Sequence, residues 1–158
     1  MGVFVQVDGI EGDSKFKNHE NWIVAESCTI PTTRPETQTT MGKVTDRTRA
    51  NVDFDDVQLK KSMDMASPFL MHWNLQGKGR KVTVHFTDEN NWYLEYVMEN
   101  TILTKLDIDA DAEGTATETL SLDFTKIEYV YRTKSETGDE YEVKGKRLHY
   151  DISTGVLD

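Results

Sequence analysis

The chain of 158 residues is long enough for one domain with its own core, and its net charge of −10 argues against a nucleic acid or an anionic membrane as partner. Its single cysteine excludes an internal disulfide. Residues 1–8 lack the basic and apolar regions of a secretory signal, and no apolar run approaches the roughly 18 residues that a membrane span requires. We therefore expect one soluble domain, residues 1–158, that is made in the cytoplasm.

The first predicted strand contains Val3, Val5 and Val7 on one face and ends in the acidic turn "DGIEGDS". The glycines of this turn suggest a phosphate loop. However, the turn is acidic and is followed neither by a Lys-Ser/Thr pair nor by a helix. We interpret it as a connector between two strands, and His19 beyond it as an ordinary surface or packing residue.

The segment Pro31–Arg49, "PTTRPETQTTMGKVTDRTR", is rich in threonine and has almost no apolar residues. Four basic residues outnumber two acidic ones here, which gives a local charge of +2 within an acidic protein. A loop of this length is uncommon in a compact domain and is usually functional or disordered.

The segment "SPFLMHWNLQGKG" predicts one short helix. Ser67 is a suitable N-cap, Pro68 fits the first helical position, and Gly77 fits the position just after the helix. An apolar stripe is expected on this helix, formed by Phe69, Met71, Trp73 and Leu75.

The rest of the chain alternates with a period of two, which is typical of strands. Lys81–Thr87 places Val82, Val84 and Phe86 on one side. Residues 92–108 form a long strand, in which Trp92, Leu94, Tyr96, Met98, Ile102 and Leu106 are in phase. The phase changes near Thr125 and again around Gly145, so we expect bulges or bends there. Such strands suit a curved barrel or two packed sheets.

No residue pattern indicates an enzyme or a metal site. The four histidines are not at metal-ligand spacing, and the chain contains no nucleophile motif. Asp107, Asp109, Asp111 and Glu118 match positions of a calcium loop, but Ala112 stands where that loop needs glycine, and the flanks alternate like strands. An exposed acidic hairpin is the better interpretation. We predict no catalytic, cofactor-binding or metal-binding residue.

Several motifs in the right order resemble the haemolysin-coregulated proteins (Hcp), the tube subunits of type VI secretion systems. They are "VDGIEGDS" with "KNHENWIVAES", "MDMASPFLMHWNLQGK", "TETLSLDFTKIEYVYR" and "HYDI" near the end. The resemblance implies a β-barrel of two packed antiparallel sheets with one short helix at its side and a long extended loop. It also implies hexameric rings that stack into a hollow tube. A contracting sheath ejects the tube beneath a spike protein, without a signal peptide and with effectors in the lumen.

Within this resemblance, charge sign suggests two candidate assembly elements. Arg34, Lys43, Arg47 and Arg49 are candidates for a basic assembly loop, and Asp107, Asp109, Asp111 and Glu113 for an opposing acidic surface. Two alternatives remain open. A small lectin-like, ligand-binding β-barrel would be a monomer with an apolar pocket, and an enzyme of unrecognised type would gather perturbed titratable groups in a cleft.

Overall fold

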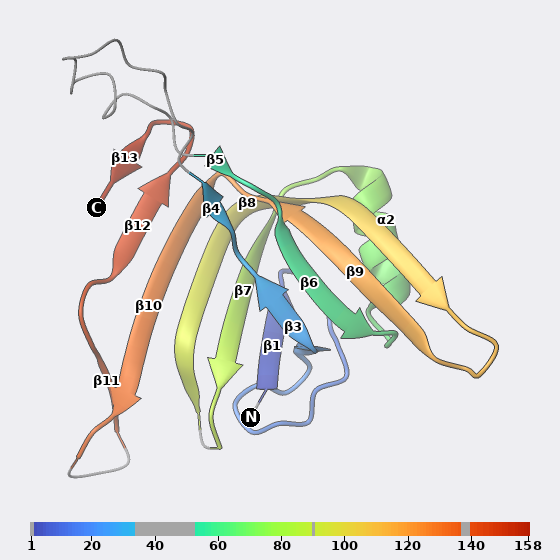
Figure 1. Cartoon of the computed structure of the whole chain (residues 1–158), viewed down its shortest axis with the longest axis horizontal. Coiled ribbons are helices and arrows are strands. Elements are labelled where there is room, and N and C mark those ends of the chain that lie inside the picture. The colour runs from blue at the N-terminus through green and yellow to red at the C-terminus, as the bar shows by residue number, and fades with distance from the viewer. Residues whose placement is uncertain (1, 34–52, 90, 137–139) are drawn as a thin grey trace.

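In the computed structural model, the described residues are 2–33, 53–89, 91–136 and 140–158, and they form strands with a single helix at their side (Figure 1). The elements are β1 (Gly2–Val7), β2 (Ile23–Ala25), β3 (Ser27–Thr29), β4 (Thr32–Thr33), β5 (Asp53–Phe54), β6 (Val57–Ser62), α2 (Ser67–Gln76), β7 (Arg80–Thr87), β8 (Trp92–Ala110), β9 (Ala116–Asp123), β10 (Lys126–Lys134), β11 (Tyr141–Val143), β12 (Leu148–Asp151) and β13 (Val156–Leu157). The prediction of a mainly β protein with one short helix is confirmed.

The strands close into a barrel through antiparallel pairs. From β1 the pairing passes to β7, then to β8, β9, β6 and β3. Only Glu26 separates β3 from β2, which pairs with β1 again. The two expected layers are therefore parts of one continuous, curled sheet. Strand β10 pairs with the first half of β8, and β12 and β13 extend the sheet beyond β10.

The core fills the barrel interior, and its members come from most of the strands and from α2. Val82, Val84, Leu122 and Trp73 are fully buried within it. The face of β7 opposite Val82 is covered as well, because His85 and Thr87 are also buried. The alternation alone had assigned those two residues to the other, polar side of the strand.

The long strand β8 changes its inward face in the middle, which was not predicted. Met98 is buried, but Thr101 and Leu103 are the next buried residues, and Ile102 is only half-buried. Asn100 lies between them with φ of +51°, a left-handed conformation that rotates the following residues by one position. A register irregularity between Leu103 and Lys105 then brings Leu106 into contact with the core.

Both predicted irregularities in the later strands are confirmed. Asp123 and Lys126 flank a break between β9 and β10, and both strands remain paired with β8. Around Gly145, Leu148 lies opposite Tyr129 whereas Val143 lies opposite Arg132. The segment from Val143 to Leu148 is therefore two residues longer than the stretch of β10 that it faces.

The helix occupies the predicted range and ends at Gly77, whose φ of 68° is the left-handed conformation expected after a helix. Its N-cap is Ala66, however, and not Ser67. Ser67 is the first helical residue, and its hydroxyl is used elsewhere, as described below. Within the described part of the chain, no helix has the length and apolar character to cross a membrane.

Candidate assembly surfaces

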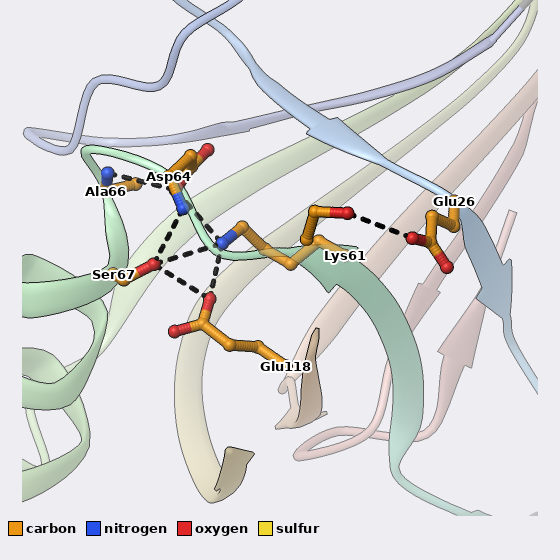
Figure 2. Close-up of polar contacts among 7 residues, drawn as sticks. Glu26, Lys61, Asp64, Ala66, Ser67 and Glu118 are labelled. Atoms are coloured by element: carbon orange, nitrogen blue, oxygen red, sulfur yellow. Dashed lines mark hydrogen bonds and ion pairs between the residues drawn. The ribbon is translucent and has the colours of Figure 1, made fainter. Parts of the chain in front are cut away.

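The start of α2 is fixed by a buried polar network at the motif "MDMASP" (Figure 2). Lys61 of β6 forms an ion pair with Glu118 of β9, and it lies 3.0 Å from the Asp64 carboxylate. The Ser67 hydroxyl donates to Glu118 over 3.0 Å and accepts from the Asp64 backbone N–H over 3.0 Å. Two strands and the helix are thereby joined at one point.

Because this network is buried, its net contribution to stability is smaller than the cost of losing one of its partners. The side chains of Lys61 and Glu118 are 1% and 0% exposed. A buried ion pair contributes little net stability against an apolar pair of the same shape, but loss of one partner leaves an uncompensated charge in the core. The motif residues therefore determine how the helix joins the barrel, and sequence reasoning had used Asp64 and Ser67 only as signals of a helix start.

Several apolar side chains of α2 are exposed, which contradicts part of the predicted stripe. Leu70 and Trp73 point into the core and are fully buried. Phe69, Met71 and Leu75 are 56%, 46% and 80% exposed. Phe69, Met71, Trp73 and Leu75 are spaced by two residues, so they cannot share one face of a helix with 3.6 residues per turn. Only Trp73 of that set belongs to the core.

Other exposed apolar residues and a groove adjoin these side chains. Met63 and Met65, just before α2, are 47% and 52% exposed. Met65 and Phe69 line one side of an open groove of about 730 Å³, and Trp22 lies on the other. Three acidic residues of the connection between β1 and β2 also line this groove: Asp8, Glu11 and Glu20. We call Met63, Met65, Phe69, Met71 and Leu75 the helix-side patch.

The acidic hairpin is confirmed as the turn between β8 and β9. Asp107, Asp109, Asp111 and Glu113 are all exposed. Asp107 already has a partner in Lys105, at 3.4 Å, and Asp111 accepts hydrogen bonds from the backbone N–H groups of Glu113 and Thr115. The side chains of Asp109 and Glu113 are thus better placed to meet another molecule than those of Asp107 and Asp111.

The same hairpin explains the calcium-like spacing. Glu118 pairs with Ile108 in the β8–β9 ladder, level with the aspartates, but its side chain is buried beside Lys61 whereas theirs are exposed. Among the described residues, no group of three or more histidine, cysteine, aspartate or glutamate side chains is arranged to hold a metal ion.

The four basic candidates, Arg34, Lys43, Arg47 and Arg49, lie outside the described residues. What the structure describes is the base of their segment, where Thr32 and Thr33 pair with Phe54 and Asp53 in the β4–β5 ladder. The predicted loop Pro31–Arg49 therefore contains the short strand β4 directly after Pro31, and β5 follows the loop in the chain.

Sequence reasoning missed a hydrogen-bonded chain of titratable groups on the face of β7 that points away from the core. His19 and His85 are 66 positions apart in the sequence, but Nε2 of His19 lies 2.8 Å from Nδ1 of His85. Nε2 of His85 lies 2.6 Å from the Glu95 carboxylate. Both histidines are buried, which confirms the packing interpretation of His19. No spacing within the sequence could reveal this contact, because β1 and β7 bring the two residues together.

Aromatic rings surround these histidines. His19 packs against Phe4, Phe16 and Trp22, and His85 against Trp22 and Trp92. The stack continues to the guanidinium of Arg132, which lies 3.4 Å from the centre of the Trp92 ring and 4.7 Å from that of Tyr141. The burial of these rings ties the connection between β1 and β2 to β7, β8 and β10.

Comparison with known proteins supports the resemblance. The sequence model of a family described as "Type VI secretion system effector, Hcp" matches residues 4–131. The curated proteins contain no match to this chain.

Solved structures show the same fold. A type six secretion system protein superposes with a TM-score of 0.86 at 14% identity, with 99% of each chain covered. Hcp1 from Salmonella typhimurium gives 0.76 at 22% identity over 100% of each chain. A type VI secretion system effector from Yersinia pestis gives 0.70 at 23% identity, covering 94% of this chain and 98% of the other.

Proposed function

Because this chain belongs to the Hcp family of type VI secretion system proteins, we propose that it is a structural subunit of the secretion tube. Six copies close into a ring, and rings stack into a hollow tube. The tube is assembled in the cytoplasm and capped by the spike protein. The contracting sheath around it then ejects both into the extracellular space or a target cell. Effectors travel in its lumen.

The helix-side patch is the observation that carries self-assembly. Exposed apolar side chains that gather in one region commonly mark contacts with other proteins. Leu75 is 80% exposed although the same helix buries Leu70 and Trp73 completely. The helix thus still exposes Phe69, Met71 and Leu75, on more than one side, after its own core contacts are complete. A closed ring uses this kind of surface in a heterologous contact, in which two different patches of identical copies meet.

Purified protein tests this proposal by light scattering after gel filtration and by negative-stain microscopy. We expect rings for the natural sequence, and their loss in a variant with Phe69→Ser and Leu75→Ser. A matched control with His72→Ser and Gln76→Ser changes two exposed positions of the same helix and should still form rings. Rings from the apolar variant at the same concentration would count against the helix-side patch as an interface.

A charge contact between copies is the second part of the proposal. Arg34, Lys43, Arg47 and Arg49 provide positive charge, and the acidic hairpin provides an exposed surface of opposite sign. Because Asp107 and Asp111 already have partners in their own hairpin, Asp109 and Glu113 are the acidic side chains that would carry this contact. Such rim charges mainly steer association and set its salt dependence.

The alternative of a monomeric ligand-binding barrel makes a different prediction. It requires an apolar pocket, whereas the interior of this barrel is filled by its own core and the 730 Å³ groove is open on the outside. A sample that remains monomeric at high concentration and binds a small molecule tightly would favour this alternative.

A further inference from the structure

The contact between His19 and His85 depends on how many protons the two rings carry. The Glu95 carboxylate accepts a hydrogen bond, so the nearby Nε2 of His85 carries a proton. In the neutral His85 ring, Nδ1 is then an acceptor, and it receives the proton on Nε2 of His19. One tautomer of each ring satisfies both contacts.

The arrangement has room for one additional proton but not for two. Nδ1 of His19 faces the carbonyl oxygen of Lys17 at 3.5 Å, so a proton added there finds an acceptor nearby. A second added proton must go to Nδ1 of His85. Two N–H groups would then point at each other across 2.8 Å, and two positive rings would be in contact. The contact cannot survive in that state.

The surroundings oppose the added charge more than they support it. Phe4, Phe16, Trp22 and Trp92 enclose the rings. The charged groups near them are Glu20 of the same connection, Glu95 of β8 and Arg132 of β10, the last balanced by Asp88 and Tyr141 beside it. Burial lowers the pKa of His19, and the charges of His85 and Arg132 lower it further, whereas Glu20 and the Lys17 carbonyl act in the opposite direction.

We propose that the His19–His85 contact is an acid-sensitive latch. At neutral pH it holds the connection between β1 and β2, residues 12–22, against the barrel, and in mildly acidic solution it releases that connection. Besides this contact, the connection is held by the packing of Phe16 against Phe4 and of Trp22 against His85, and its own backbone hydrogen bonds join Gly12, Ser14, Asn21 and Trp22. The latch is a property of the single subunit and does not depend on ring formation.

The direction of the pH effect follows from proton binding. The unfolded chain has a histidine pKa near 6.5, and the folded chain holds His19 below that value. As the pH falls through 6.5, the released state therefore binds more protons than the closed state and becomes favoured.

Histidine NMR and hydrogen exchange of the unmodified protein between pH 8 and 5 test the latch. We expect the His19 ring to take up its proton below pH 6.5, the ordinary pKa of histidine. Backbone exchange in residues 13–22, corrected for its intrinsic pH dependence, should rise at least about tenfold over the same interval, while β9 stays protected. A His19 ring that takes up its proton at or above pH 6.5, or unchanged protection of residues 13–22, would overturn the proposal.

A variant separates the latch from general acid sensitivity. His19→Gln keeps a side-chain donor towards His85 but cannot gain a proton, so the pH-dependent rise in exchange should disappear. His72→Gln, on the exposed side of α2, should retain the rise. A His19→Gln protein that responds to pH like the unmodified protein would contradict the latch. If that variant does not fold, the titration of the unmodified protein decides alone.

Discussion

Lys61 of β6 lies directly opposite Glu118 of β9, and their buried ion pair also contacts the first residue of α2 through the Ser67 hydroxyl. The helix-side patch begins two residues after Lys61, at Met63. The ion pair is therefore the internal support of a surface that we assign to assembly, and its geometry determines where that surface is presented.

Replacement of Lys61 by methionine should lower the free energy of unfolding by about 3–5 kcal/mol, because it leaves the Glu118 carboxylate buried without its cation. Urea unfolding measures the effect. Lys60→Met, one position away on the exposed side of β6, should change stability by less than about 0.5 kcal/mol. Adding Glu118→Leu to Lys61→Met should recover most of the loss. Equal effects at positions 60 and 61 would contradict the buried-pair interpretation.

Gly12→Ala should destabilise the protein by about 3 kcal/mol, because the new methyl group would meet the backbone of Trp22 and Ile23. A Cβ atom at this position would lie 2.6 Å from the Ile23 Cα atom and 2.6 Å from the Trp22 carbonyl oxygen. Gly77→Ala is a useful comparison, since its Cβ meets open space and only its left-handed conformation costs energy, about 1 kcal/mol. Thermal unfolding of both variants should place Gly12→Ala clearly lower, and the reverse order would exclude the close approach.

Cys28 should react slowly in the native protein. Burial raises the pKa of its thiol from 9.0 to about 12, and the thiolate is the reactive species. At pH 8 we expect labelling of the folded protein to be roughly 10³-fold slower than in urea. Since the chain has one cysteine, the rate is unambiguous and also reports opening of β3. Similar rates in both conditions would mean that the thiol is accessible in the folded state.

The charge contact between copies predicts a salt effect. Replacing Arg34, Lys43, Arg47 and Arg49 with alanine should weaken ring stacking and make the remaining stacking less sensitive to salt. The combination Asp109→Asn and Glu113→Gln should have the same effect from the other partner. A control that removes the same charge at exposed Lys15, Lys17, Lys60 and Lys146 should leave the salt dependence intact. Unchanged stacking by the first variant, measured by light scattering at low and high salt, would refute this contact.

Local patterns in the sequence predicted the elements well. Pro68 and Gly77 marked the two ends of the helix, and the phase changes near Thr125 and Gly145 marked real irregularities, because turn residues and period-two alternation act over a few positions. Where the local pattern was ambiguous, the prediction was wrong. Asn100 changes the inward face of β8 through its backbone conformation, which residue type alone did not indicate.

The contacts between distant segments could not be predicted in this way. Lys61 meets Glu118 across 57 positions, and His19 meets His85 across 66. Strand register sets the first contact, and the path of the connection between β1 and β2 sets the second. The residues are of types that are usually exposed or only partly buried. The exposed face of α2 was missed for a related reason, since a helix with apolar residues all round does not reveal which side the barrel covers.

Glu26 alone separates the strand that pairs with β1 from the strand that pairs with β6. At this corner the two halves of the barrel are joined by peptide bonds as well as by hydrogen bonds. With a single residue between them, β2 and β3 cannot slide past one another, so the register of the β1–β2 ladder is locked to that of the β3–β6 ladder. A slip of one ladder would have to be accompanied by the same slip of the other.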